Sequence, residues 1–157
     1  MAHLTKFSFG ATSAIVTSLA LIVGLSRTAN PRLSIIGSLL VIAIADNISD
    51  SLGIHIYQES ELLNSKIVRS ATFTNFFTRF LTILIFILLF AFLPIRYAEI
   101  LSIGYGILVL SILSYLIARE QKVSPYRAIL NHLAIAILVI VVSGLLSEWL
   151  IDIFRKT

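Results

Sequence analysis

The sequence has no cysteine and three prolines in 157 residues, and only 13% of its residues are charged. The lack of cysteine excludes a disulfide framework, a thiolate metal site and a cysteine nucleophile. The low charge content accompanies 58% hydrophobic residues and a mean hydropathy of +0.99. A soluble domain of this size cannot bury so much apolar surface, so the composition indicates an integral membrane protein. The net charge of +4 is spread over the chain ends and loops without a basic block, which argues against nucleic-acid binding.

Five apolar segments are long enough to cross roughly 30 Å of hydrocarbon at about 1.5 Å per residue. They cover residues 7–26, 33–57, 72–94, 98–118 and 127–150. The prolines fall in or beside the predicted connectors, where a missing N–H does no damage. The first run is longer than the apolar region of a signal peptide, and we expect it to remain as a helix. The sequence therefore predicts an all-α fold: a single membrane domain over residues 1–157, a bundle of five transmembrane helices with the termini on opposite sides.

Orientation follows from the lysines and arginines near the predicted span ends. One side would hold Lys6, Lys66, Arg69, Arg119, Lys122 and Arg127, and the other Arg27, Arg32, Arg96, Arg155 and Lys156. Arg79, near the start of the predicted third span, adds one to the first group. The first group lies on the side of the N-terminus, and its small excess of lysine and arginine favours a cytoplasmic N-terminus.

Two carboxylates, Asp46 and Asp50, lie one helical turn apart in the predicted second span, in the stretch "AIADNISDSLGIHIYQESE" (43–61). The Leu, Ile and Val residues of 33–57 favour insertion by about 4–7 kcal/mol, while two acids near mid-membrane cost about 5–7 kcal/mol. Such a helix needs a bundle that shelters its acidic face, on which we also expect Asn47. Intramembrane acids commonly hold a cation or a proton. The structural alternative is that they pair with Arg79 or bond to Ser and Thr on neighbouring helices.

Polar residues after the acids extend this pattern. Glu59 and Glu61 are further candidate metal ligands, and His55 lies at i,i+4 to Glu59 and could share a metal with it. A solvated helix end explains His55 and Glu59 equally well. Ser13, Thr17 and Ser49 complete the candidate path-lining residues, although Ser/Thr rows are often interhelical hydrogen-bonding groups.

Small residues predict close helix contacts at the row Gly10, Ala14 and Ser18, and at Gly104 and Gly106. We expect His132 to be a hydrogen-bonded packing residue. Tyr97, Tyr126 and Trp149 lie near span ends, as interfacial anchors do.

The chain resembles the vacuolar iron transporters, five-helix membrane proteins that export ferrous iron or manganese from the cytosol. The resemblance rests on "SAIVTSLALIVGLS" (13–26), "GSLLVIAIADNISDSLGIHIYQESE" (37–61), "FLP" (92–94) and "SPYRAILNHLAIAILVIVVSGLL" (124–146). In the second segment the matched positions are Gly37, Ala45, Asp46, Ser49, Gly53, Ser60 and Glu61. The resemblance implies a homodimer with a metal path near the two-fold axis and proton-coupled export.

Departures from the family pattern affect the expected ligands. Ser13 stands where the family has a metal-path Asp, Asp50 where it has Met, and Ile54 where it has an acid. The soluble glutamate-rich insert between the second and third helices is absent. Replacing a thioether by a carboxylate favours harder ions such as Mn²⁺, Fe²⁺ or Mg²⁺.

We therefore expect a non-enzymatic transporter of divalent metal ions, with Fe²⁺ or Mn²⁺ as substrate and no cofactor. Its partners would be these ions, the lipid bilayer and a second copy of the chain. The host membrane would be a prokaryotic cell membrane or a eukaryotic vacuole-type membrane. The alternative is a membrane scaffold or partner subunit of the same family that no longer transports. An intramembrane hydrolase fits poorly, because Asp46 and Asp50 on adjacent turns of one helix do not converge on a scissile bond.

Overall fold

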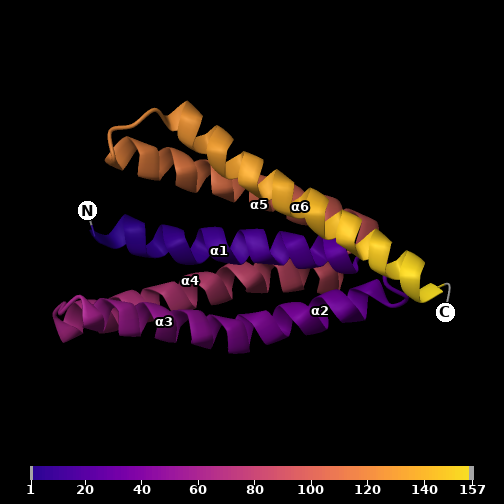
Figure 1. The fold of residues 1–157 in the computed structure, drawn as a ribbon, viewed down its shortest axis with the longest axis horizontal. Helices are drawn as coiled ribbons and strands as arrows, with labels where there is room; N and C mark the ends of the chain where they lie inside the picture. Colours follow the sequence, from indigo (N-terminus) through magenta and orange to yellow (C-terminus); the bar gives the residue numbers. More distant parts are fainter. Residues whose placement is uncertain (1, 156–157) are drawn as a thin grey trace.

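The computed structural model describes the backbone of residues 2–155 and the side chains of residues 10–154. Its elements are α1 (Ala2–Leu25), α2 (Pro31–Val41), a π-helical turn η1 (Ile42–Asp46), α3 (Asn47–Ser60), α4 (Ser65–Phe92), α5 (Ile95–Glu120) and α6 (Pro125–Arg155). No strand occurs within residues 2–155, so the predicted all-α class is confirmed (Figure 1). The side chains of Lys6 and Arg155, and all of Lys156, which entered the orientation argument, lie outside the described residues.

Four helical segments among the described residues have the length and hydropathy of membrane spans. They are Pro31–Ser60, Ser65–Phe92, Ile95–Glu120 and Pro125–Phe154. These helices support a multi-pass membrane protein. In α1 the apolar part that lies within the described residues is Gly10–Leu25, which is shorter than these four segments, so a fifth span is not established.

α3 and α4 extend beyond the predicted spans 33–57 and 72–94, so the connector between them is shorter than predicted. α3 continues to Ser60, and α4 begins at Ser65, where the side chain of Asn64 accepts a hydrogen bond of 2.9 Å from the Lys66 N–H. This cap satisfies a backbone donor that the first turn of the helix leaves free. Hydropathy detects the apolar part of a helix only, so it cannot register polar turns at helix ends.

All three prolines lie at helix starts, as their placement in the connectors predicted. Pro31 and Pro125 are the first residues of α2 and α6, and Pro94 directly precedes α5. The first helical position needs no N–H donor, so proline is accommodated there.

Helix α1 is the central element, and it contacts α2, α4, α5 and α6. Figure 1 shows α2, η1 and α3 as one long rod beside α4, and the pair α5 and α6 on the other side of α1. The two termini lie at opposite ends of the molecule (Figure 1).

Glycines permit the close approach of α1 to its neighbours at two predicted positions. A Cβ on Gly10 would lie 2.6 Å from Asn75 Oδ1 and 3.1 Å from the Asn75 carbonyl oxygen, and one on Gly106 would lie 2.7 Å from Leu19 Cδ1. Ala14 and Ser18 are buried, which confirms the predicted row. Gly104 has no atom within 4 Å of such a Cβ, so the contact predicted there is wrong.

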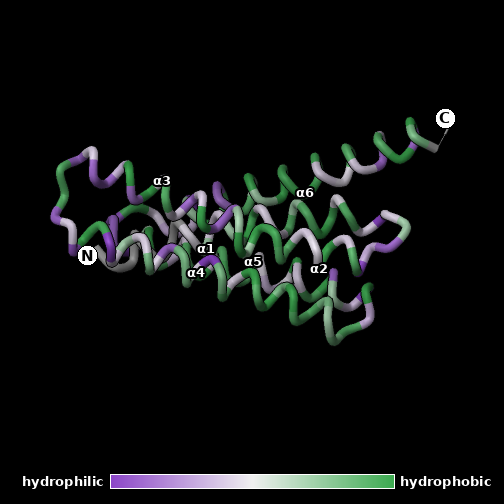
Figure 2. Tube along the Cα trace, turned by 90° about the horizontal axis from the view of Figure 1, so that it is seen from below, coloured by the Kyte–Doolittle hydropathy of each residue, from purple (hydrophilic) through white to green (hydrophobic). Residues whose placement is uncertain are grey.

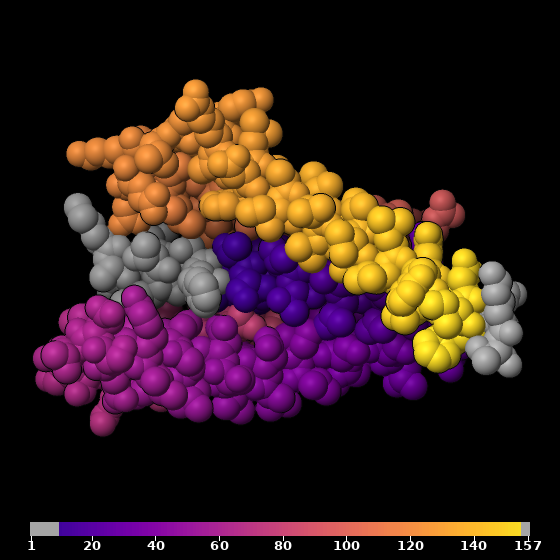
Figure 3. Space-filling model, in the orientation of Figure 1, coloured from indigo at the N-terminus to yellow at the C-terminus, as the bar shows by residue number. Residues whose placement is uncertain are grey.

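The outer surface of the bundle is largely apolar. Figure 2 shows hydrophobic stretches along the helices and hydrophilic ones at the turns, and in Figure 3 the rod from α2 to α3 forms one outer edge of the molecule. Large side chains such as Leu33, Phe92 and Phe154 are exposed. A surface of this composition suits contact with lipid, where exposed apolar side chains cost nothing.

Candidate functional site

The two acids of the second predicted span meet a buried arginine on α4. Arg79 Nη2 donates to Asp46 Oδ2 at 2.5 Å, and Arg79 Nη1 lies 3.2 Å from Asp50 Oδ2. Arg79 Nη1 also donates to Ser13 Oγ on α1 at 2.7 Å. One guanidinium therefore joins α1, α4 and the rod of η1 and α3. Pairing with Arg79, the structural alternative for these acids, is confirmed.

Besides its ion pair with Arg79, Asp50 accepts a hydrogen bond from another residue of α4. Asn75 Nδ2 donates to Asp50 Oδ2 at 3.1 Å and lies 3.2 Å from Ser51 Oγ. Asn75 and Arg79 are one helical turn apart, so both reach the same face of α3. Oδ2 of Asp50 thus accepts a hydrogen bond from Asn75 and forms an ion pair with Arg79. We call the group Ser13, Asp46, Asp50, Asn75 and Arg79 the acid–arginine cluster.

Arg79 lies deep in its helix, which corrects its predicted position near a span start. It follows the first residue of α4, Ser65, by about 21 Å of helix rise, near the middle of Ser65–Phe92. Asp46 is similarly central in Pro31–Ser60. Arg79 is therefore central in a helix of spanning length, and it does not count among the charges at the helix ends.

The three charged side chains of the cluster differ in exposure. The Arg79 side chain is 1% exposed, whereas that of Asp50 is 28% exposed and that of Asp46 is 50% exposed. Two carboxylates face one guanidinium, so the cluster carries a formal charge of −1 when both acids are ionised. Of the three charged groups, the carboxylate of Asp46 is the most exposed.

A π-helical turn ends at Asp46. In η1 the N–H of Asn47 bonds to the carbonyl of Ile42, five residues back. The side chain of Asn47 donates to the carbonyl of Ala43 at 3.3 Å and to that of Phe76 on α4 at 2.9 Å. Single π turns inside α-helices are rare and frequent at functional sites. Here the turn sets the rotation of Asp46 relative to α2.

Asn47 has a packing role that differs from its predicted place on the acidic face. It is fully buried and bonds to α4, whereas Asp46 and Ser49 are exposed. Ser49 is exposed beside the acids, and Thr17 on α1 is half-buried. Of the predicted path-lining residues, all of which lie within residues 10–154, only Ser13 forms a hydrogen bond with Arg79.

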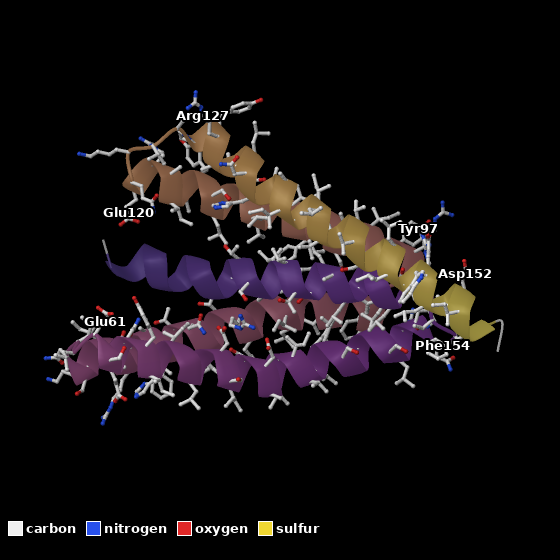
Figure 4. All side chains as sticks on the ribbon, viewed as in Figure 1. Glu61, Tyr97, Glu120, Arg127, Asp152 and Phe154 are labelled. Atoms are coloured by element: carbon white, nitrogen blue, oxygen red, sulfur yellow. The ribbon has the colours of Figure 1, made fainter. Side chains whose placement is uncertain are left out.

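The other predicted ligands lie near the far end of α3. His55 Nε2 is 3.2 Å from Glu59 Oε1, and His55 Nδ1 is 3.0 Å from Thr72 Oγ1 on α4. The Thr72 hydroxyl donates to the Val68 carbonyl, so the ring nitrogen must donate to Thr72. Glu61 follows α3 and is exposed at its end (Figure 4).

These residues do not gather into one metal site. Glu59 is about 13 Å of helix rise beyond Asp50. Within residues 10–154, no group of three His, Asp or Glu side chains is placed to hold a metal ion. Metal binding at the cluster would therefore use Asp46 and Asp50 with neutral oxygens, and it would compete with Arg79.

Sequence reasoning missed Asn75, Ser51 and Thr72. Thr78 and Arg79 follow Asn75 by three and four residues, Thr82 follows them by four and three, and all four residues are buried. A polar stripe of this period within an apolar helix predicts a face turned to the bundle interior. This polar stripe is the sequence feature from which the place of Asn75 in the bundle interior could have been predicted.

No family model matches this chain, and no curated protein or solved structure does either. The resemblance to vacuolar iron transporters therefore rests on the sequence motifs alone.

Proposed function

We propose that this chain is a multi-pass membrane transporter for cations and that the acid–arginine cluster is its ion-binding element. The supporting observation is the pair Asp46 and Asp50, half-way along a helix of spanning length, with one arginine for two carboxylates. Charged groups at this depth are costly, and intramembrane acids commonly mark ion or proton paths. The π turn beside Asp46 supports the same reading.

The resemblance to vacuolar iron transporters suggests Fe²⁺ or Mn²⁺ as the substrate and proton-coupled export from the cytosol. In this proposal a divalent ion binds Asp46 and Asp50 after Arg79 leaves their Oδ2 atoms. Protons that bind the carboxylates release the metal, and the later loss of these protons lets Arg79 pair with Asp46 and Asp50 again. The hard oxygen ligands favour Mn²⁺ and Fe²⁺ over softer ions.

The exposure of Asp46 supports a homodimer as part of the proposal. Its half-exposed carboxylate lies, by helical spacing, on the same face as the exposed residues Ser49, Gly53 and Tyr57. A charge that faces lipid at mid-span costs about 2.5 kcal/mol or more. A second copy placed on this face would shelter the carboxylate and enclose the path. The proposed orientation has the N-terminus in the cytoplasm, in a cell membrane or a vacuole-type membrane.

A scaffold without transport is the second candidate, and the contacts of Arg79 favour it. This side chain links α1, α3 and α4 through Ser13, Asp46 and Asp50. An ion-pair network that connects helices can serve structure alone.

Metal uptake into proteoliposomes under an imposed pH gradient separates the two candidates. The wild-type chain is compared with Asp46→Asn and Asp50→Asn, and with Asp152→Asn as a matched control. Asp152 lies near the end of α6, away from the cluster (Figure 4). We expect gradient-dependent Mn²⁺ or Fe²⁺ flux in the wild type and the control, and a loss of about tenfold or more in each cluster variant.

Flux at the level of empty liposomes, from wild-type protein that is folded by circular dichroism, would favour the scaffold. Equal flux in Asp46→Asn, Asp50→Asn and wild type would move the path away from the cluster. A chain that carries Mg²⁺ as well as Mn²⁺ would broaden the substrate class without changing the site.

A further inference from the structure

A polar hollow lies where α5 ends and α6 begins, at the opposite side of α1 from α3 and α4. Its volume is about 370 Å³, and it is independent of the acid–arginine cluster. The polar residues that line it are Gln121, Ser124, Arg127, Asn131 and His132. None of its lining residues is acidic, so the hollow presents one fixed cation and several neutral hydrogen-bond donors.

The position of this hollow matches the depth of lipid headgroups. It includes the four-residue turn between Ile95–Glu120 and Pro125–Phe154, two helices with the length and hydropathy of membrane spans. The ends of such helices lie in the headgroup region of a bilayer. Figure 4 shows Glu120 and Arg127 at this end of the helix pair.

The hydrogen bonds of His132, which lines the hollow, show which of its ring nitrogens carries the proton. Ser114 Oγ donates to the Leu110 carbonyl at 2.6 Å and lies 2.8 Å from His132 Nδ1. A hydroxyl has one proton, so Ser114 must accept from His132 Nδ1–H. His132 is therefore a hydrogen-bonded packing residue, as predicted, and Nε2 is the ring nitrogen left for a ligand.

The surroundings add positive charge and an apolar wall. Arg119 precedes the turn and Lys122 lies within it, and the acidic residue Glu120 lies between these two cations in the sequence. Ile117, Ala118, Val123 and Ala128 form the apolar part of the lining. Basic hollows between transmembrane helices near the membrane surface suit acidic lipid headgroups. An apolar wall beside the donors suits the glycerol and upper acyl carbons of the same molecule.

We propose that this hollow binds a phosphate ester group, with Arg127 as the charged ligand and Asn131 as a neutral donor. The source favoured by the apolar wall and the membrane depth is an anionic phospholipid such as phosphatidylglycerol. A soluble phosphate shares the recognised chemistry and differs by its lack of an apolar part.

The test measures binding of phosphatidylglycerol, phosphatidylcholine with the same acyl chains, and sodium phosphate to the detergent-purified chain. The readouts are native mass spectrometry and thermal stability. We expect phosphatidylglycerol to bind the wild type more tightly than phosphatidylcholine does, and Arg127→Ala to weaken that binding by about tenfold or more. The matched control, Arg96→Ala, removes an exposed cation at the other end of α5 and should leave binding unchanged.

Asn131→Ala keeps the test decisive if Arg127→Ala does not fold, and it should weaken binding by roughly two- to tenfold. Sodium phosphate that binds the wild type and not Arg127→Ala, with no preference between the two lipids, would assign the site to a soluble phosphate. Equal binding of both lipids without a phosphate effect would overturn the proposal. An equal loss in Arg96→Ala and Arg127→Ala would also overturn it, because binding would then follow net charge alone.

Discussion

Replacing Arg79 by methionine tests whether the acid–arginine cluster holds the helices together. Methionine has a similar length and no charge, so the change removes the guanidinium and keeps much of the packing. Arg79 is 1% exposed and bonds to Ser13, Asp46 and Asp50, and its loss leaves two acids without their cation. Breaking a buried pair of this kind costs about 3–5 kcal/mol. The half-exposed Asp46 places the expected loss in the lower part of this range.

The measurement is the free energy of unfolding in mixed micelles, followed by far-UV circular dichroism. Arg96→Met is the control, because Arg96 is an exposed cation at the start of α5, and we expect it to change stability by less than about 0.5 kcal/mol. The triple variant Asp46→Asn, Asp50→Asn, Arg79→Met removes every charge of the cluster. It should recover most of the loss, since replacing a whole buried ion network by neutral groups is often neutral or stabilising.

Two outcomes would refute this reasoning. Arg79→Met with the stability of the wild type would mean that the cluster does not hold the helices together. A triple variant no more stable than Arg79→Met would mean that the arginine acts through its packing and not through its charge.

Two further substitutions test the helix contacts. Gly10→Ala should destabilise the bundle by about 1–3 kcal/mol, because its Cβ would lie 3.1 Å from a carbonyl oxygen of α4. Gly104→Ala is the control and should not destabilise the bundle, because its Cβ would lie in open space. Equal melting temperatures of the two variants would contradict this prediction. Asn47→Ala removes two hydrogen bonds to carbonyls and should cost about 1–2 kcal/mol in the same unfolding assay, with the exposed Ser49→Ala as the control. A loss no larger than that of Ser49→Ala would show that Asn47 does not stabilise the π turn.

The cluster itself was only partly predictable. Asp46 and Asp50 stand out in any apolar span because their cost in lipid is large, and Arg79 was a possible partner on the same ground. Asn75 and Ser51 did not stand out, because neutral polar residues are common in membrane helices. The π turn could not be predicted from the sequence, because no residue type distinguishes a turn with one extra residue from an ordinary α-helical turn.

The sequence by itself determined the helical class, the apolar segments and the helix starts at its three prolines, because hydropathy and the missing proline N–H act locally. Tertiary structure alone decided that Arg79 faces both acids, that Asn47 is buried against α4 while Asp46 stays half-exposed, and that Gly10 touches another helix while Gly104 touches none. These features depend on how far each helix is rotated and where it crosses its neighbours. Rotation and crossing follow from the packing of whole helix faces, which no short stretch of sequence contains.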